Sequence, residues 1–277
     1  SISSCNGSGT SLRGSYGSGP GSRRIRARGR RRNIHIHGNE TAGNTHIKFA
    51  VFRRKRLLHV ETSPEAGFSD HIKALFDTYP NISHAIISSV SNLDRWAADV
   101  VSVFCKVYVL SPDCKIPIKN SYATPQTLGP DRLALATAAF YNNPKGNTLV
   151  IDAGTCITYD MVNDHGEYLG GAISPGLYMR YNALHEFTDR LPLLTPENVL
   201  DFIGNATESS MHSGVVNGIC LEIDGVINQY KSRFRDLTVI LTGGDAQFLS
   251  KRLKNTIFAH SNFLLEGLNQ LLEYNKS

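Results

Sequence analysis

The chain lacks the cysteine pattern of a disulfide-bonded or zinc-binding domain. Its five cysteines contain no CxxC pair, and no cluster of histidine and cysteine has the spacing of zinc ligands; they are Cys5, Cys105, Cys114, Cys156 and Cys220. Free thiols in a reducing cytosol are the expected state, so we predict a cytoplasmic protein. No apolar run approaches the length that spans a bilayer, and we expect no membrane contact.

The common signatures of nucleotide-binding folds are also missing. The sequence contains no GxxxxGK[ST] loop, no GxGxxG turn after a strand and no set of protein-kinase motifs. His35 and His37 alternate on a predicted strand, but without a third ligand they are expected to be surface residues rather than a metal site. Any nucleotide site must therefore be built from other elements.

Residues 1–32 contain no acidic residue and few apolar ones. They hold eight of the 29 basic residues, so the other 21 face 24 acidic residues and the body carries a charge near −3. This Ser/Gly/Arg-rich segment is predicted to be a disordered tail. An organelle-targeting leader, a nucleic-acid arm and a mistranslated upstream sequence are alternatives for it. We expect no nucleic-acid partner for the body of the protein.

Two glycine turns of similar sequence stand in the two halves of the chain, at residues 42–48 and 153–158. Each has an Ala-Gly step, then a hydroxyl or amide residue, then an apolar strand. Glycine lets the backbone turn tightly and approach a ligand, and the amides and hydroxyls of such a turn donate to phosphate oxygens. Two such turns predict a nucleotide-dependent phosphotransferase that holds a polyphosphate from both sides.

Strand and helix patterns alternate from Asn33 onward, which favours an α/β fold. Strands are predicted at residues 33–37, 49–52, 85–87, 101–110, 149–152, 157–162 and 238–241. Helices are predicted around residues 93–98 and at 133–141, 213–230 and 263–274. Together with the repeated glycine turn, this pattern predicts two related domains with a cleft between them.

Three charged residues are candidates for chemistry, each with a structural alternative. Asp152 ends a strand before the second glycine turn, where a carboxylate holds a cation beside phosphate or simply caps the turn. Asp131 and Arg132 begin a predicted helix as a general base and an anion-binding partner. The alternative for Asp131 is an acid that complements the helix dipole.

Further segments extend the two glycine turns to an ordered set of motifs. The set consists of Gly43-Asn44-Thr45-x-x-Lys48, Tyr122 with Leu128-Gly129-Pro130-Asp131-Arg132, Ile151-Asp152-Ala153-Gly154-Thr155, residues 170–177, Gly204-Asn205-Ala206-Thr207 with Ser213-Gly214, residues 241–245 and residues 265–268. Taken in this order, the motifs resemble the type III pantothenate kinase family, which belongs to the superfamily of acetate and sugar kinases, heat-shock ATPases and actin. The resemblance runs from about Gly43 to the C-terminus.

The resemblance implies two actin-like (ribonuclease H-like) domains, at residues 33–130 and 131–277, with a nucleotide cleft between them. It also implies transfer of the ATP γ-phosphate to the primary hydroxyl of pantothenate, which is the first step of coenzyme A biosynthesis. The expected cofactors are Mg²⁺ and a monovalent cation, K⁺ or NH₄⁺. The expected assembly is a homodimer with the pantothenate pocket near the interface.

The same resemblance implies roles for individual residues. Asp131 is the expected base and Arg132 its anion-holding partner, while Asp152 is expected to bind the cation. Pantothenate is expected to contact Tyr122, Gly129 and Thr207, the last of which would serve the neighbouring subunit's site. The expected nucleotide and phosphate contacts are Gly43, Asn44, Thr45, Lys48, Gly154, Thr155, Gly243 and Gly244.

The first phosphate motif departs from the family pattern, which reads Asp-x-Gly-Asn-Thr. Thr41 stands where the Asp is expected, and a neutral hydroxyl does not supply the charge of a carboxylate. A shifted register that uses Gly38 is an alternative, although the spacing to Lys48 favours Gly43. An alternative function is therefore a catalytically weakened homologue that acts as a ligand-binding or regulatory accessory protein.

Overall fold

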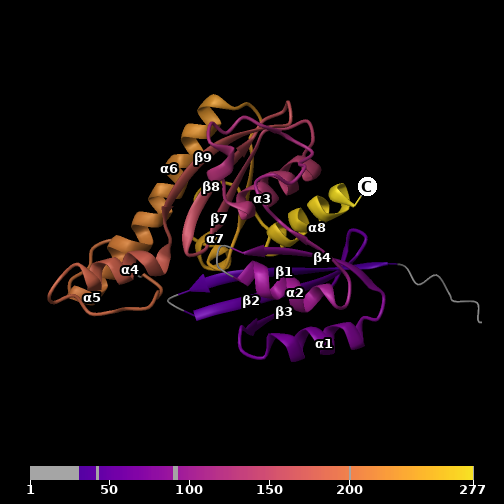
Figure 1. Cartoon of the computed structure of the whole chain (residues 1–277). Coiled ribbons are helices and arrows are strands. Elements are labelled where there is room, and N and C mark those ends of the chain that lie inside the picture. Colours follow the sequence, from indigo (N-terminus) through magenta and orange to yellow (C-terminus); the bar gives the residue numbers. More distant parts are fainter. Residues whose placement is uncertain (1–30, 42–43, 90–92, 200, 277) are drawn as a thin grey trace, which may run out of the picture.

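The computed structural model describes residues 31–41, 44–89, 93–199 and 201–276. Two β-sheets stack with helices between them and on their outer faces (Figure 1). The tail predicted to be disordered lies outside the described residues, except for Arg31 and Arg32 at its end.

The first sheet has the strand order β3-β2-β1-β4-β5. The strands β1, β2 and β3 form an antiparallel meander, and β4 and β5 continue on the other side of β1 as parallel strands. Their bounds are β1 Arg32–Thr41, β2 Asn44–Arg53, β3 Arg56–Pro64, β4 Ile82–Ser89 and β5 Lys106–Val109.

The second sheet repeats this connectivity in the order β11-β10-β7-β8-β9-β6. Here β7, β8 and β9 form the antiparallel meander, and β10 and β11 lie parallel on the other side of β7. The bounds are β6 Lys119–Asn120, β7 Thr148–Ala153, β8 Cys156–Val162, β9 Glu167–Pro175, β10 Thr238–Thr242 and β11 Phe258–Ala259. The predicted fold of two related actin-like units is confirmed.

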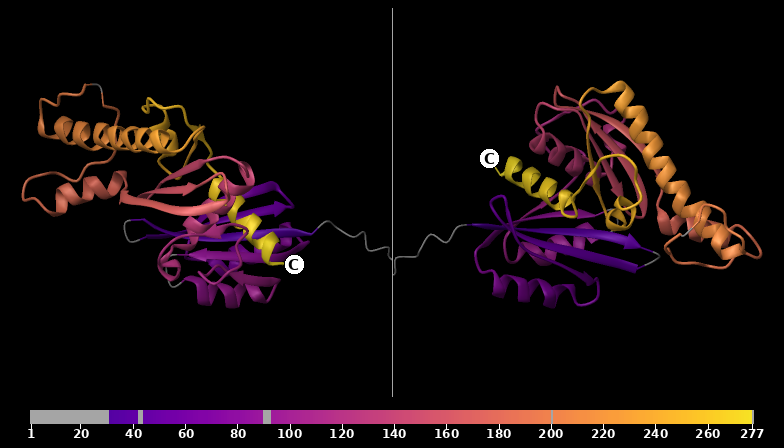
Figure 2. Two further views of the ribbon diagram at one scale, coloured as in Figure 1. Left: turned by 90° about the horizontal axis from the view of Figure 1, so that it is seen from above. Right: turned by 180° about the vertical axis from the view of Figure 1, so that it is seen from behind.

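The helices form three layers around the two sheets (Figure 2). Helices α1 and α2 pack on the outer face of the first sheet, and α4, α6 and α7 on the outer face of the second. Helices α3 and α8 lie between the sheets. The bounds are α1 Phe68–Thr78, α2 Leu93–Ser102, η1 Pro125–Thr127, α3 Pro130–Asn142, α4 Leu177–Glu186, α5 Thr207–His212, η2 Ser213–Asn217, α6 Gly218–Arg233, α7 Ala246–Ser250 and α8 Phe263–Asn275.

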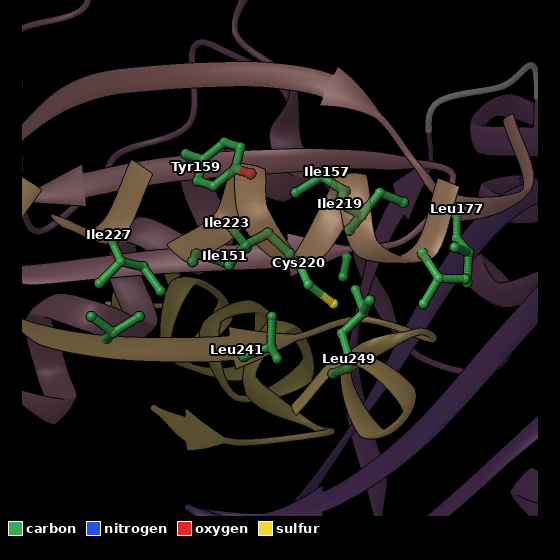
Figure 3. Close-up of a cluster of buried hydrophobic side chains, with 14 of the residues drawn as sticks. Ile151, Ile157, Tyr159, Leu177, Ile219, Cys220, Ile223, Ile227, Leu241 and Leu249 are labelled. Carbon is green, nitrogen blue, oxygen red and sulfur yellow. The ribbon is translucent and has the colours of Figure 1, made fainter. Parts of the chain in front are cut away.

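Helix α6 covers the second sheet with an isoleucine stripe (Figure 3). Ile219, Ile223 and Ile227 recur every four residues, a spacing that places them on one helix face, and all three are fully buried. They pack against the strand side chains that face α6, among them Ile151 and Leu241. This core fixes the edge of the sheet at which β7 and β10 end.

The middle layer depends on a close approach of α8 to α3. A Cβ atom at Gly267 would lie 2.0 Å from the carbonyl oxygen of Ala134, so only glycine allows the two helices to come this close. The side chain of Asn33 on β1 donates a 2.9 Å hydrogen bond to Asn269 on α8. The middle helices are thus tied to both sheets.

The predicted strand at residues 101–110 is wrong in its first part. Helix α2 continues to Ser102, and the strand β5 begins only at Lys106. Val101 is fully buried in the core beneath α2, so an apolar residue that fits a strand pattern belongs to the buried face of a helix. A short apolar run does not distinguish the two periods.

The predicted helix at residues 213–230 begins with the wider turn η2 before α6 starts at Gly218. The division into domains at residue 130 stays a prediction; β6, which precedes it, pairs with β9 of the second sheet.

Cys105, Cys114, Cys156 and Cys220 are free thiols. Among the described helices, none has the length and apolarity needed to cross a membrane.

The contact between α3 and α8 predicts opposite effects of the same substitution at two helical glycines. Gly267→Ala forces a methyl group against the Ala134 carbonyl and should lower the free energy of unfolding by about 2 kcal/mol. Gly225→Ala on α6, where no atom lies within 4 Å of the new Cβ, should raise it by roughly 0.5–1 kcal/mol. Urea unfolding of both variants measures the difference, and equal effects would contradict the packing described.

Candidate active site

A cleft of about 940 Å³ opens between the two sheets, at the end of the middle helix α3. Its lining combines residues of both sheets and of α3, which are His37, Gly38, Lys48, Asp131, Asp152, Gly154, Thr155, Cys156, Thr158, Thr242, Gly243, Gly244, Ala246, Gln247, Ser250, Ala259, His260, Ser261 and Leu264. Six of the predicted site residues therefore meet with Asp131 in one place: Lys48, Asp152, Gly154, Thr155, Gly243 and Gly244.

The wall formed by the second sheet is built where the parallel strands β7 and β10 end. Asp152 lies beside Thr242 in register, and each is followed by a glycine turn. Gly243 has φ +97°, and a Cβ atom there would lie 2.4 Å from Oδ1 of Asp152. The amide of Asp245 donates a 3.0 Å hydrogen bond to the carbonyl of Ala153, which holds the two turns together. Glycine at this position lets the backbone reach the carboxylate.

Asp152 is a carboxylate in an unfavourable electrostatic environment. Burial and the nearby charges of Asp131 and Asp160 together raise its pKa to about 7, and Lys48 acts in the opposite direction. Burial also lowers the pKa of the Lys48 ammonium, and Asp152 acts against this shift. A cation bound near Asp152 would relieve the repulsion among the acids.

The wall formed by the first sheet is the hairpin of β1 and β2. Thr41, the last residue of β1, pairs with Asn44, the first residue of β2, which agrees with the register that the spacing to Lys48 favours. Gly43 lies outside the described residues, and Asn44 and Thr45 are the first residues of β2. Gly38 lies within β1, so the alternative register, in which the glycine motif would begin at Gly38 directly after the strand, is wrong.

The interpretation of the two histidines as surface residues is wrong. His35 is fully buried and its ring stacks on Phe52 with a centroid distance of 4.5 Å. His37 is half-buried and lines the cleft beside Lys48, its cross-strand partner on β2. Burial lowers the pKa of His37, and Asp131 acts in the opposite direction. The period of two along a strand placed both rings on one face, and that face looks towards the middle layer of the fold.

Asp131 stands in the first turn of α3, directly after Pro130, whose fixed φ suits that position. Its Oδ1 accepts a 2.9 Å hydrogen bond from the backbone amide of Arg132, which orients the carboxylate. A Cβ atom at Gly129 would lie 2.5 Å from the same oxygen. Glycine at this position therefore leaves room for the carboxylate at the rim of the cleft.

Arg132, the next residue, is buried and forms an ion pair with Asp160. Its Nε donates a 2.7 Å hydrogen bond to Oδ1 of Asp160, which also accepts one of 2.7 Å from the hydroxyl of Tyr168. Burial alone would lower the pKa of Arg132, but Asp160 beside it gives a net rise. Asp160 and Tyr168 were not predicted; the signal was an acid within the apolar strand 157–162, since a buried charge needs a partner.

Tyr122 packs on the other side of Arg132, with the guanidinium carbon 5.6 Å from the ring centroid. A Cβ atom at Gly170, which has φ +90°, would lie 2.9 Å from the Tyr122 ring. The glycine block at residues 170–177 therefore serves in part to seat this tyrosine. Tyr122 and Arg132 form one cluster beside Asp131, although neither lines the open cleft.

Thr207 lies elsewhere, at the start of α5. It lines a second cavity of about 1050 Å³, with Arg180, Phe187 and Met211 among its neighbours. The two cavities share no described lining residue. Within one chain, the structure does not bring Thr207 to the cleft of Asp131.

The cleft offers one strong candidate for a cation ligand rather than a complete metal site. Among the described residues, no group of three or more His, Cys, Asp or Glu side chains is arranged to hold a metal ion. Asp152 is the carboxylate at the glycine turns. Mg²⁺ is commonly held by one or two carboxylates with phosphate oxygens and water completing its shell, so this donor set fits a metal that arrives with a nucleotide.

Comparison with known proteins identifies the family. The family model described as type III pantothenate kinase matches residues 41–229. The chain belongs to this family. A type III pantothenate kinase from Christiangramia forsetii is 51% identical over 235 residues, covering 85% of this chain and 97% of that protein. One from Flavobacterium johnsoniae is 48% identical over 232 residues, covering 84% and 95%.

The resemblance predicted from the motifs is thus confirmed. Among solved structures, a ROK hexokinase from Thermus thermophilus is similar with a TM-score of 0.44 and 12% identity, covering 88% of this chain and 99% of that one. The match to the family begins at Thr41, immediately before the turn of the first glycine motif.

The raised pKa of Asp152 predicts how stability changes with pH in the absence of Mg²⁺ and nucleotide. The folded-state pKa of about 7 lies above the ordinary value of 3.8, so the fold loses stability as pH rises between these two values. Asp152→Asn removes the ionisation. Its free energy of unfolding relative to the unmodified chain should increase from about pH 4 to about pH 7 and then level off. Urea titrations across this range test it; a constant difference would contradict the assigned environment.

Proposed function

We propose that this chain is an active pantothenate kinase, which transfers the γ-phosphate of ATP to the primary hydroxyl of pantothenate and gives 4′-phosphopantothenate. The observation that carries the proposal is the position of Asp131. In a chain of this family, it faces the same cleft as Lys48, Asp152 and the glycine turns.

The phosphates of the nucleotide lie between the turn at Gly154-Thr155 and the turn at Gly243-Gly244, which both border the cleft. The Gly154 amide donates to the carbonyl of Cys156, so the turn at Gly243-Gly244 supplies the backbone amides for the phosphate oxygens. Lys48 provides a positive charge from the opposite wall. The turn with Gly43, Asn44 and Thr45 belongs to the same proposed set of contacts. Positioning and charge stabilisation of this kind supply most of the catalysis in phosphoryl transfer.

Asp131 acts as the general base on the pantothenate hydroxyl. The amide of Arg132 fixes its carboxylate, so the group is oriented before the substrate arrives. Removing the proton as the oxygen attacks the γ-phosphorus makes the hydroxyl a better nucleophile. Tyr122, Gly129 and Arg132 hold the substrate beside it, and the arginine pairs with the carboxylate of pantothenate.

Asp152 holds the cations. Burial and the neighbouring acids raise the pKa of its carboxyl group to about 7, so a positive partner in the cleft would stabilise the charged form. When bound, Mg²⁺ neutralises the charge of the phosphates. A monovalent cation, K⁺ or NH₄⁺, is proposed to bind beside the same carboxylate.

The assembly is proposed to be a cytoplasmic homodimer, and the second cavity supports this. Phe187 lines the same cavity as Thr207 and is 87% exposed. Phe202 and Ile203 are 70% and 76% exposed in the segment before α5. Exposed apolar side chains of this size are typical of a protein contact. Thr207 then completes the pantothenate site of the neighbouring subunit.

Asp131→Asn tests the role of the base. The amide keeps the shape of the carboxylate but does not accept a proton, so kcat should fall on the order of 10²–10⁴-fold. ATP binding, measured by calorimetry, should change little because the base acts on the other substrate. Equal losses of ATP binding and of the free energy of unfolding would instead mark Asp131 as a helix cap.

Thr41→Asp tests whether the first motif limits the enzyme. We expect pantothenate-dependent ATP turnover by the unmodified chain with Mg²⁺ and K⁺, and a higher kcat/KM for ATP after the substitution restores the carboxylate. Turnover only in Thr41→Asp would show a kinase disabled at this motif. Pantothenate binding without turnover in either protein would refute the proposed function and favour the accessory protein.

A further inference from the structure

A buried ion pair stands behind the proposed substrate residues. Asp160 on β8 is completely buried, and Arg132 on α3 is 5% exposed. The distance from Nε of Arg132 to Oδ1 of Asp160 is 2.7 Å. Truncating one partner of such a pair is costly because it leaves the other charge without compensation in a medium of low polarity.

Asp160 also accepts two hydrogen bonds from its own sheet. Tyr168 on β9 donates to Oδ1 at 2.7 Å, and Thr158 donates to Oδ2 at 3.0 Å. The carboxylate is therefore fixed from two neighbouring strands, and the guanidinium is fixed through the carboxylate. Tyr122 covers the guanidinium at 5.6 Å. Together these contacts leave Arg132 little rotational freedom.

One donor nitrogen of the Arg132 guanidinium, Nη2, is buried and has no hydrogen-bond partner among the described residues. Its ion pair is with Asp160, and its side chain forms none with the neighbouring Asp131 in the part of the chain that the structure describes. An unpaired donor on a buried cation destabilises the folded state, so its presence calls for an explanation. A substrate anion would supply the missing acceptor.

We propose that Asp160 is a positioning residue, which holds Arg132 through Nε so that its Nη donors meet the carboxylate of pantothenate. The inference rests on the proposed function, because it assigns the anion to that substrate. Nε and Nη2 belong to one planar group, so fixing the first sets the direction of the second. Tyr168 and Thr158 act one step further out, by fixing Asp160.

The test compares two substrates that share the reacting hydroxyl and differ in the anion. Pantothenol carries an alcohol in place of the pantothenate carboxylate. In Asp160→Asn, the ratio of kcat/KM for pantothenate to that for pantothenol should fall on the order of 10–100-fold, the worth of a charge-assisted hydrogen bond. A general loss of folded protein or of base strength cancels in this ratio.

Asp224→Asn is the matched control. Asp224 is also a buried acid, but it accepts the amides of Lys254 and Asn255 and holds a loop beside α6. The same chemical change there should leave the substrate ratio unaltered. A double variant checks the route: in an Arg132→Gln background, Asp160→Asn should produce no further fall in the ratio, because the residue acts only through Arg132.

If Asp160→Asn does not fold, two less disruptive variants test the positioning role of Asp160. Tyr168→Phe deletes one hydroxyl bonded to Asp160 and should lower the ratio about 3- to 10-fold. Tyr159→Phe deletes a hydroxyl on the neighbouring strand that donates instead to Glu222, and it should leave the ratio unchanged.

An unchanged ratio in both Asp160→Asn and Tyr168→Phe would overturn the inference, as would an equal fall in Asp224→Asn. An independent, multiplicative fall in the Arg132→Gln background would also overturn it. If the unmodified chain phosphorylated neither substrate, the proposed function itself would fail, which this comparison distinguishes from failure of the positioning role alone.

Discussion

The contact of α3 with α8 between the two sheets is the constraint on which the rest of the structure depends. At Gly267 the helices approach so closely that a single methyl group would collide with the carbonyl of Ala134. Both helices also contribute apolar side chains to the cores beneath the sheets. Because α3 begins at Pro130, the place of this helix sets where Asp131 meets the glycine turn after β7. Packing between the two middle helices therefore determines the geometry of the cleft.

The charges of the site follow from that geometry. Asp131, Asp152 and Asp160 come from a helix and two strands, and they are close enough that both of the others raise the pKa of Asp152. Lys48 and Arg132 are the cations that face them. Arg132 compensates Asp160 in the interior, whereas Asp152 stays at the open cleft with an acid beside it. The protein thus separates a permanent ion pair from a carboxylate for which we propose a cation partner.

Much of the site was predictable because its residues belong to short motifs in sequence order. A glycine turn directly after a strand has a local cause, and Gly243 and Asp152 meet because the neighbouring parallel strands β7 and β10 end at one edge of the sheet. The part that was not predicted depends on contacts between distant segments. The sequence pattern identified Asp160 only as one residue of an apolar strand. Its partner Arg132 lies 28 positions away along the chain, and only the fold brings the two together. The pattern predicted His37 to be exposed, but the fold places it in the cleft, on the face of β1 that packs against α8.

By itself, the sequence determined the α/β class, the two glycine turns, the candidate base and the family to which the chain belongs. Each of these depends on residues that lie next to one another or repeat with a fixed period. Only the tertiary structure decided that Arg132 faces Asp160 rather than open solvent, that Thr207 lines a separate cavity, and that residues 101–102 end a helix. The reason is physical: burial and charge pairing are set by which elements pack together, and a local pattern carries no information about a partner that packing has yet to supply.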